Sequence, residues 1–454
     1  MREELKVKIL ERLATGPKIS RELVSLVGAS QPTLSRAIRE LGTQVVILGR
    51  GRATRYARPR LVRGITSQFP VYRIDEAGDA HLLGLLQALA GGHYWWQPED
   101  SAKESRLFDY LPWFIQDMRP EGFVGRAFAQ GQGADLGLPA KLTDWTDDDV
   151  LIALFRRGED HIGNLIIGEE SIERYLKFAQ KPAPEVPEPA RQQVYADLAR
   201  AAMEGDPAGS SAGGEQPKFA AMLRAGDVRR HVLVKFSPPI IQADGQRWAD
   251  LLLCEHLALE VVRDAGIPSA SSRILEADSR VFLEVDRFDR VGSSGRSSLL
   301  SLRAIDGEYL GIGSDWAKCA RGLLQAGVIS PEDARKMRWL KVFGDLIGNT
   351  DMHLGNLSFI RVRSRFYALA PVYDMLPMLY RPVSGETPHR EFAPGAMTLE
   401  TADVRPEALQ SALRFWDRAG AEPRLSDEFK AICRNNFSVL QKLETAPRII
   451  TKKV

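Results

Sequence analysis

Three groups of apolar residues near the start of the chain recur at a spacing of three or four positions: Leu5, Ile9 and Leu13; Ile19, Leu23 and Leu26; and Leu34, Ile38 and Leu41. This period predicts three amphipathic helices. Gly16 and Pro17 separate the first helix from the second. Ser20 and Ser30 fit helix starts, and Pro32 is tolerated in a first turn.

The segment that follows, TQVVILGRGRATRYA, has the pattern of a β-hairpin, with a β-like run, a Gly-Arg turn and a second β-like run that ends at Tyr56. Three helices and a hairpin predict a winged helix-turn-helix domain over residues 1–62. The stretch SQPTLSRAIREL also resembles the recognition helix of bacterial winged-helix regulators.

In that fold the second helix of the pair enters the major groove, and arginines of the hairpin reach the DNA backbone or the minor groove. The side chains expected to face DNA are Gln31, Thr33, Ser35, Arg36 and Arg39 on the third helix, and Arg50, Arg52 and Arg55 on the hairpin. The alternative is a small helical oligomerisation module with a solvated basic face. DNA binding is favoured because the hairpin arginines have no evident packing role.

Charge is distributed unevenly along the chain. Through Arg63 there are 14 Lys or Arg and 5 Asp or Glu, a balance of +9, so the remainder must carry −7 to give the whole chain its +2. Positive charge clustered at one end favours a nucleic-acid partner, because neutralised phosphates release counterions.

The rest of the chain predicts an α+β protein. Residues 63–190 are mixed and end in the Pro-rich stretch KPAPEVPEPA, which should be extended. Residues 191–290 combine short strands with one long helix around RWADLLLCEHLALEVVRDAG, and residues 291–454 are mostly helical. Together with residues 1–62, these ranges are the expected domains.

Cysteine usage and hydropathy favour the cytoplasm. The three cysteines, Cys254, Cys319 and Cys433, are far apart and odd in number, which argues against a disulfide framework. The charged start of the chain does not resemble a secretory signal, and the longest apolar stretch, HLLGLLQALAGG, is too short to span a bilayer.

The loop GNTDMHLGN carries the first candidate chemistry. Asp351 and Asn356 have the spacing of the aspartate and asparagine in a protein-kinase catalytic loop, where the aspartate orients the attacking hydroxyl and the amide oxygen binds Mg²⁺. A short hairpin after this loop would return Asp374 to the same cleft as a second metal ligand. The alternative is an Asx-turn cluster in which Asn349 and its neighbours satisfy local backbone groups.

A loop of small residues and a strand lysine occur upstream. The loop AGSSAGGEQPKFAAML would let backbone N–H groups approach phosphates closely. Lys235 in HVLVKFS would bind the α- and β-phosphates of ATP, with Glu255 holding its amine. The segment EVDRFDR would line the adenine pocket. The alternative for Lys235 is an edge-strand lysine that points at water.

The ordered motifs S-x-x-G-x-Q-x-K, V-K-F, D-R-F-D-R, G-N-x-D-x-H-x-x-N and Y-D-M resemble the HipA family of bacterial serine/threonine kinase toxins. The stretches FDYLPWFIQDMRPEG and LFRRGEDHIGNLIIG resemble its N-terminal region, so the resemblance covers roughly residues 105–440. It implies a protein-kinase-like, two-lobed fold that uses ATP and Mg²⁺.

The resemblance also implies residue roles. Asp351 would be the catalytic base, Asn356 and Asp374 the Mg²⁺ ligands, and Lys235 the ATP-phosphate lysine. The phosphate loop would contain Gly214, Gln216 and Lys218, the adenine pocket Asp286 and Phe288, and the autophosphorylation site Ser211 or its neighbour Ser210. His353 matches the motif's histidine, and a hydrogen bond that shapes the loop is favoured over proton transfer.

The chain departs from the family pattern at Pro217, where an acid is usual, and at Asp286, where glutamate is more usual. The fused N-terminal domain resembles the single-chain branch of the family, in which one polypeptide could bind DNA. HipA toxins usually pair with a separate DNA-binding antitoxin, which the fused domain would replace or supplement.

The favoured function is therefore a growth-arresting kinase toxin that autoregulates through DNA. Its protein substrate would be a translation factor such as an aminoacyl-tRNA synthetase. One alternative is a transcription regulator whose kinase-like body binds nucleotide but phosphorylates little. Another is a metal-dependent nuclease in which Asp351, His353 and Asp374 hold metal ions.

Overall fold

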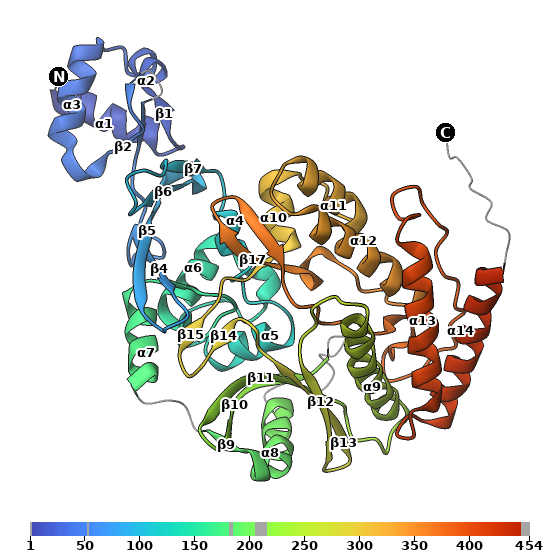
Figure 1. Ribbon diagram of the computed structural model, residues 1–454. Coiled ribbons are helices and arrows are strands. Elements are labelled where there is room, and N and C mark those ends of the chain that lie inside the picture. The colour runs from blue at the N-terminus through green and yellow to red at the C-terminus, as the bar shows by residue number, and fades with distance from the viewer. Residues whose placement is uncertain (1, 52–53, 181–184, 205–215, 446–454) are drawn as a thin grey trace. The chain divides into compact units, whose positions relative to one another are not determined.

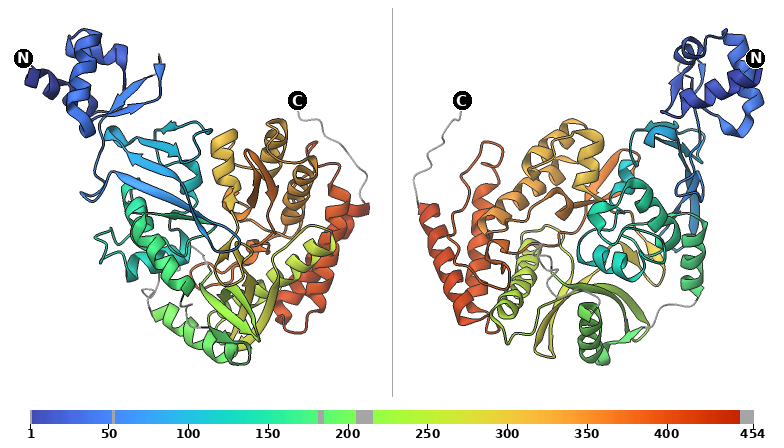
Figure 2. Two further views of the ribbon diagram at one scale, coloured as in Figure 1. Left: turned by 60° about the vertical axis from the view of Figure 1, so that its left-hand side comes forward. Right: turned by 180° about the vertical axis from the view of Figure 1, so that it is seen from behind.

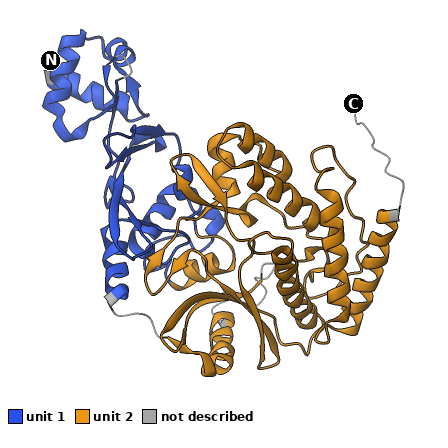
Figure 3. Ribbon diagram, viewed as in Figure 1, with its two compact units in different colours: residues 1–119, 132–181 blue, residues 120–131, 182–454 orange. Residues whose placement is uncertain are grey.

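The computed structural model describes residues 2–51, 54–180, 185–204 and 216–445. The chain divides into two compact units (Figure 3), a first unit of Met1–Arg119 and Gln132–Lys181 and a second unit of Pro120–Gly131 and Pro182–Val454. Both units mix helices and strands, as expected for an α+β protein (Figures 1 and 2). The finer boundaries expected at residues 62, 190 and 290 stay a prediction.

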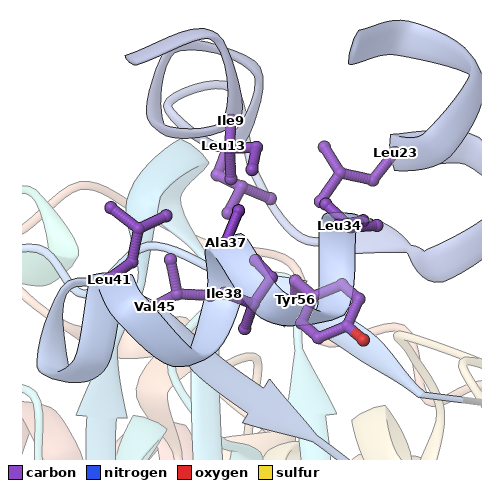
Figure 4. Packing of buried hydrophobic residues seen from close by; sticks show 9 residues of the cluster. All are labelled: Ile9, Leu13, Leu23, Leu34, Ala37, Ile38, Leu41, Val45 and Tyr56. Atoms are coloured by element: carbon purple, nitrogen blue, oxygen red, sulfur yellow. The ribbon is translucent and has the colours of Figure 1, made fainter. Parts of the chain in front are cut away.

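The first unit begins with three helices and a three-stranded sheet of order β1-β3-β2. The elements are α1 (Arg2–Leu13), β1 (Lys18–Ile19), α2 (Ser20–Val27), α3 (Gln31–Leu41), β2 (Val46–Leu48) and β3 (Arg55–Ala57). The three helices and the hairpin therefore lie where the periodicity predicts them. Their apolar faces meet in one cluster (Figure 4), made of Ile9, Leu13, Leu23, Leu34, Ala37, Ile38, Leu41, Val45 and Tyr56.

Ile19 and Leu26 depart from the predicted apolar pattern, because Leu26 lies in α2 but is 42% exposed and Ile19 is not helical. Ile19 lies in β1, pairs with Arg55 of β3, and is 41% exposed. Pro17, just before this strand, fixes an extended approach, and pairing with β3 satisfies the backbone before the helix begins at Ser20.

The remainder of the first unit is a five-stranded antiparallel sheet of order β7-β6-β5-β4-β8 with helices. Its elements are β4 (Gln68–Ile74), β5 (Ala80–Ala88), β6 (Tyr94–Pro98), β7 (Arg106–Phe108), α4 (Trp113–Gln116), α6 (Asp147–Arg157), β8 (Leu165–Ile167) and α7 (Glu169–Gln180). Most of the apolar stretch HLLGLLQALAGG forms β5. Among the described residues, no helix combines the length and apolar character needed to cross a membrane.

In the second unit, a five-stranded sheet of order β12-β13-β11-β10-β9 lies between two helices. The elements are β9 (Val186–Pro187), α8 (Arg191–Glu204), β10 (Lys218–Ala225), β11 (Val228–Phe236), α9 (Ala243–Asp264), β12 (Ser272–Ala277) and β13 (Arg280–Asp286). Val234 packs on the α8 face with Tyr195, whereas Leu283 packs on the α9 face with Leu252. Alternation along each strand thus decides which side chains face α9.

The later part of the second unit is mostly helical, as predicted. Its elements, with α5 from earlier in the chain, are α5 (Gly122–Gly131), β14 (Arg290–Val291), β15 (Gly295–Arg296), β16 (Leu300–Ser301), α10 (Leu302–Tyr309), α11 (Trp316–Gln325), α12 (Pro331–Leu346), β17 (Ser358–Arg363), β18 (Phe366–Leu369), α13 (Arg405–Ala421) and α14 (Asp427–Thr445). The hairpin expected between Asn356 and Asp374 is present as β17 and β18, with β16 completing its sheet.

Candidate active site

Lys235 lies at the centre of a buried charge cluster. Its cross-strand neighbour on β13 is Leu283, so its side chain is on the α9 face of the sheet. There its Nζ donates to Oε1 and Oε2 of Glu255, on α9, at 2.7 and 2.8 Å, and it also pairs with the carboxylate of Asp374. Lys235 is 4% exposed and Glu255 is fully buried. The alternative of a solvated edge lysine is therefore wrong.

Attraction between opposite charges favours the ionised forms of Lys235 and Asp374 despite burial, whereas the ionised form of Glu255 is disfavoured. Burial disfavours the ammonium of Lys235, but attraction to Asp374 and Glu255 outweighs it and raises its pKa. Burial likewise opposes ionisation of Asp374, yet the positive charges of Lys235 and Lys218 lower its pKa to about 2. For Glu255, burial and the nearby Asp374 raise the pKa despite the contact with Lys235.

Asn349 joins the loop of Asp351 to the segment of Asp374. It follows α12, is 4% exposed, and its Oδ1 accepts a hydrogen bond from the backbone N–H of Asp351 at 3.0 Å. Its Nδ2 lies 3.5 Å from the carbonyl oxygen of Asp374 and 3.6 Å from Sδ of Met375. One buried amide therefore holds two motifs of the predicted site together.

Asn356 closes the loop from its other end. Its Nδ2 donates to the carbonyl oxygen of Asp351 at 2.8 Å, and the side chain is 9% exposed. Because the amide nitrogen is engaged with the backbone, the amide oxygen is the atom that Asn356 can offer to a metal. An amide oxygen and the carboxylate of Asp374 are hard donors of the kind that Mg²⁺ prefers. The donor set thus fits the predicted ion.

His353 makes a local hydrogen bond that shapes the loop. The Gly355 N–H donates to its Nδ1 at 3.0 Å, and its carbonyl accepts from the indole N–H of Trp316 at 3.2 Å. This arrangement begins the 3-10 turn Leu354–Asn356. The nuclease alternative requires Asp351, His353 and Asp374 to hold metal ions together. Within the described chain, no three or more His, Cys, Asp or Glu side chains are grouped so that they could hold a metal ion.

Tyr373 is a site residue that the motif search missed. Its hydroxyl donates to the carbonyl of Gly355 at 2.9 Å and lies 2.6 Å from Oγ of Ser358. It precedes Asp374, whose backbone has a φ of 54°, in the left-handed region that ordinary residues rarely adopt. The only sequence signal was its place inside the Y-D-M motif.

Several other predicted site residues lie near the charge cluster of Lys235 or near Tyr373, and four lie outside the described residues. Lys218 is the direct cross-strand partner of Lys235, and Gln216 is buried close before it. Phe288 lies near Tyr373, with ring centroids 5.9 Å apart, and packs on the α9-side cluster. Gly214, Ser210 and Ser211 lie outside the described residues, as does Arg52 of the predicted DNA surface.

Asp286 is not brought to Lys235. It lies three positions after Leu283 on β13, so the pleat directs it to the opposite face, where its carboxylate pairs with Arg230. Arg230 also reaches Glu284, which accepts a hydrogen bond from Tyr195 on the α8 face at 2.9 Å. The side chain of Asp286 thus belongs to a charge network on the other side of the sheet.

Two family models match the chain. Residues 65–176 match the YjjJ-like toxin middle domain, and residues 210–441 match the HipA-like C-terminal domain. A curated relative, Toxin YjjJ of Escherichia coli (strain K12), is 36% identical over 446 residues, covering 96% of this chain and 98% of that protein.

Two solved structures are similar at a lower level. One is from the complex of Shewanella oneidensis HipA, HipB and operator DNA, with a TM-score of 0.46, 15% identity, and coverage of 82% of this chain and 96% of that one. The other is the Helicobacter pylori proinflammatory kinase CtkA, with a TM-score of 0.35, 14% identity, and coverage of 49% and 90%.

Proposed function

The chain belongs to the family of HipA-like toxins, and we propose that it is an ATP- and Mg²⁺-dependent kinase that phosphorylates serine or threonine in proteins. The observation that carries this proposal is the position of Lys235, buried between Glu255 and Asp374. Asp374 is linked through Asn349 to the loop that carries Asp351. A strand lysine, a helix glutamate, a loop aspartate and a metal-binding aspartate are the recurring parts of a protein kinase.

The residues would divide the reaction as follows. Lys235 would bind the α- and β-phosphates, and Asn356 and Asp374 would hold Mg²⁺, which neutralises charge on the phosphates when bound. Asp351 would orient the acceptor hydroxyl and take its proton while the hydroxyl oxygen bonds to the γ-phosphorus and the bond to the ADP oxygen breaks. His353, engaged with Gly355, would keep the loop in shape.

The direct test is incorporation of label from γ-labelled ATP with Mg²⁺. The wild-type protein should label itself, on Ser210 or Ser211 by the family resemblance, and Asp351→Asn should reduce the rate by about 10³-fold or more because the base is lost. Asp417→Asn is a matched control, since Asp417 is exposed on α13. Wild-type labelling in Asp351→Asn would remove Asp351 from its role.

We further propose that the N-terminal domain, residues 1–62, binds DNA and so autoregulates expression of the protein. Gln31, Thr33, Arg36 and Arg39 are exposed along α3, and Arg50 and Arg55 are exposed on the hairpin. In the part of the chain that the structure describes, none of these four arginines forms an ion pair with an acidic side chain. Ser35 is half-buried, and Gln31 hydrogen-bonds Ser20 at the start of α2, which would hold the two helices of the pair together.

Point variants test DNA binding better than removal of residues 1–62. Leu48 and Ala57 of the hairpin pack against Leu89 and Trp95, so truncation would expose an apolar surface of the first unit. Arg36→Ala should weaken binding to the chain's own promoter DNA by about tenfold, the loss of about one charged contact. Arg21→Ala is the matched control, because Arg21 is exposed but lies on α2 and not on the proposed recognition helix. Equal affinity for all three proteins would contradict the assignment.

We propose a cytoplasmic, growth-arresting toxin whose substrate is a translation factor such as an aminoacyl-tRNA synthetase, with a separate antitoxin replaced or supplemented by the N-terminal domain. The alternative, a regulator that senses nucleotide and phosphorylates little, predicts that Asp351→Asn still arrests growth. If the kinase acts, arrest should disappear with the labelling activity.

A further inference from the structure

The hairpin of β17 and β18 carries three arginines at alternate positions. Arg361 and Arg363 lie on β17, and Arg365 lies in the turn, with only Val362 and Ser364 between them. All five residues are exposed. These three arginines, termed the arginine hairpin, lie in the part of the chain after Arg63, which carries a net charge of −7.

Aromatic rings position the three guanidinium groups. Arg361 lies over Tyr367 at 5.9 Å, Arg363 over Phe366 at 4.8 Å, and Arg365 over Tyr309 of α10 at 5.7 Å. The two tyrosines contact each other, with ring centroids 6.1 Å and hydroxyl oxygens 3.3 Å apart. Stacking restricts an arginine without satisfying its N–H donors, so less conformational entropy is lost when it binds an anion.

Three exposed arginines of the second unit that form ion pairs provide a contrast with the arginine hairpin. Arg321, Arg335 and Arg418 each form an ion pair, with Glu400, Glu407 and Asp264, at 2.5, 2.6 and 2.8 Å. Within the described chain, no acidic side chain forms an ion pair with Arg361, Arg363 or Arg365. Glu308, beside Tyr309, is the acidic group that acts on this aromatic pair.

We propose that the arginine hairpin binds the phosphate backbone of a nucleic acid. Guanidinium groups match phosphate oxygens in a bidentate manner. Protein–nucleic acid interfaces are more polar and much more positively charged than protein–protein interfaces, whose centres are enriched in aromatic residues and arginine but depleted in Lys, Glu and Asp. On the arginine hairpin the arginines lie over the rings, and Val362 is the large exposed apolar side chain of β17.

The proposal is independent of the kinase reaction and of the N-terminal domain. It assigns a second nucleic-acid surface to the unit that carries the candidate active site. Because stacked arginines present no base-reading pattern, binding should not depend on sequence, and both single strands and duplexes are candidate ligands.

The test is fluorescence anisotropy of short labelled probes, single-stranded RNA, single-stranded DNA and duplex DNA of scrambled sequence, titrated with the full chain across a range of salt concentrations. All proteins carry Arg36→Ala, so the N-terminal domain contributes less. In the test variant Arg361, Arg363 and Arg365 are each replaced by glutamine. In the control variant Arg321, Arg335 and Arg418 are replaced in the same way, which removes the same charge from a surface where the arginines are paired.

The slope of log affinity against log salt is negative, and in the test variant it should be shallower by about 2 to 3 than in the control, since each lost phosphate contact removes about 0.7 for a single strand and about 0.9 for a duplex. The probe that shows the larger change identifies the form of nucleic acid. Equal slopes for test and control variants would overturn the proposal. A labelled poly-glutamate peptide is titrated as a further probe, and a loss of binding confined to it would also overturn the proposal, because it would indicate an acidic protein partner. Circular dichroism should show the same fold for both variants.

Discussion

The side-chain oxygen of Asn349 accepts a hydrogen bond from the backbone N–H of Asp351 at 3.0 Å, while its amide nitrogen lies 3.5 Å from the carbonyl of Asp374. Asn349, whose side chain is uncharged, therefore connects the proposed base, Asp351, to a proposed metal ligand, Asp374. The buried amide of Asn349 helps to set the position of Asp351 relative to Asp374, together with Asn356, whose Nδ2 donates to the Asp351 carbonyl.

Asn349→Ala should lower the rate of phosphoryl transfer by about 10²-fold, because displacement of a catalytic group by about 1 Å costs that much. It should also lower the free energy of unfolding by about 1–3 kcal/mol, since buried partners lose their hydrogen bonds. Label transfer and thermal unfolding measure the two effects. Asn435→Ala, on the exposed side of α14, should change neither; an Asn349→Ala protein of full activity would show that Asp351 is held by other contacts.

The contact of Lys235 with Asp374 predicts how stability depends on pH. The pKa of Asp374 is lowered to about 2 in the folded chain, from about 3.9 for a free aspartate. A lowered pKa means stability that is present above about pH 4 and is lost as the pH falls toward 2, amounting to about 2 kcal/mol. Chemical unfolding at pH 6 and pH 3 measures it.

Asp374→Asn should remove this part of the pH dependence, so that the loss of stability between those two pH values becomes smaller by about 1 kcal/mol, because at pH 3 the folded carboxylate is still mostly ionised. Asp264→Asn, at an exposed ion pair with Arg418, should leave most of the dependence in place because exposed pairs contribute little. An unchanged pH profile in Asp374→Asn would mean that the carboxylate is not paired with Lys235 in solution.

Gly355 lies on the loop between Asp351 and Asn356, and the space beside its Cα is occupied by the side chains of His353 and Arg303. A Cβ at this position would lie 2.8 Å from Nη2 of Arg303 and 2.8 Å from Cε1 of His353. Gly355→Ala should therefore displace His353 or Arg303, whose guanidinium pairs with Glu121 at 3.0 Å, and reduce labelling by about tenfold or more. Both side chains are exposed and can move, so the change in stability should stay near 1 kcal/mol.

The control is Gly395→Ala, because a Cβ there meets nothing within 4 Å. The labelling rate and the melting temperature should be those of the wild type. Equal activities of the two alanine variants would show that the loop tolerates movement of His353 and Arg303.

Tyr373→Phe removes the hydroxyl that bonds the Gly355 carbonyl at 2.9 Å and Ser358 at 2.6 Å. We expect a loss of about 1–2 kcal/mol in unfolding free energy, because two buried or half-buried oxygens lose a partner. Ring packing against Phe288 should persist, so the melting curve should stay cooperative. Tyr110→Phe, at a side chain that is 73% exposed, is the matched control.

Much of the fold follows from local pattern. Helical periodicity predicts α1, α2 and α3, and the short alternating runs predict the hairpin between Asn356 and Asp374. Such periods report which side chains are buried, and burial decides the type of element. Ile19 departs from its pattern because pairing with β3, a contact between distant residues, decides its conformation.

The candidate site likewise has residues that local motifs predict and contacts that depend on distant segments. The residue types and their order were readable, because Lys235, Glu255, Asp351, Asn356 and Asp374 belong to motifs with defined spacing. For Asn349 the sequence predicts only local turns, and for Tyr373 it shows only a position inside the Y-D-M motif. The hydrogen bonds that both residues make could not be predicted, because their partners lie on other segments. The contact of Asp286 with adenine stays a prediction, and the register of β13 directs its side chain to Arg230.

The sequence by itself therefore determined the helices of the first unit, the order of the motifs and the family to which they point, because each depends on residues close together in the chain. Glu255 was predicted to hold the amine of Lys235, and the structure confirms this contact. Only the tertiary structure decided that Asp374, 139 positions away, pairs directly with Lys235, and that Asp286 faces the other side of the sheet. Strand register and the packing of α9 set those positions, and neither is encoded in a local period.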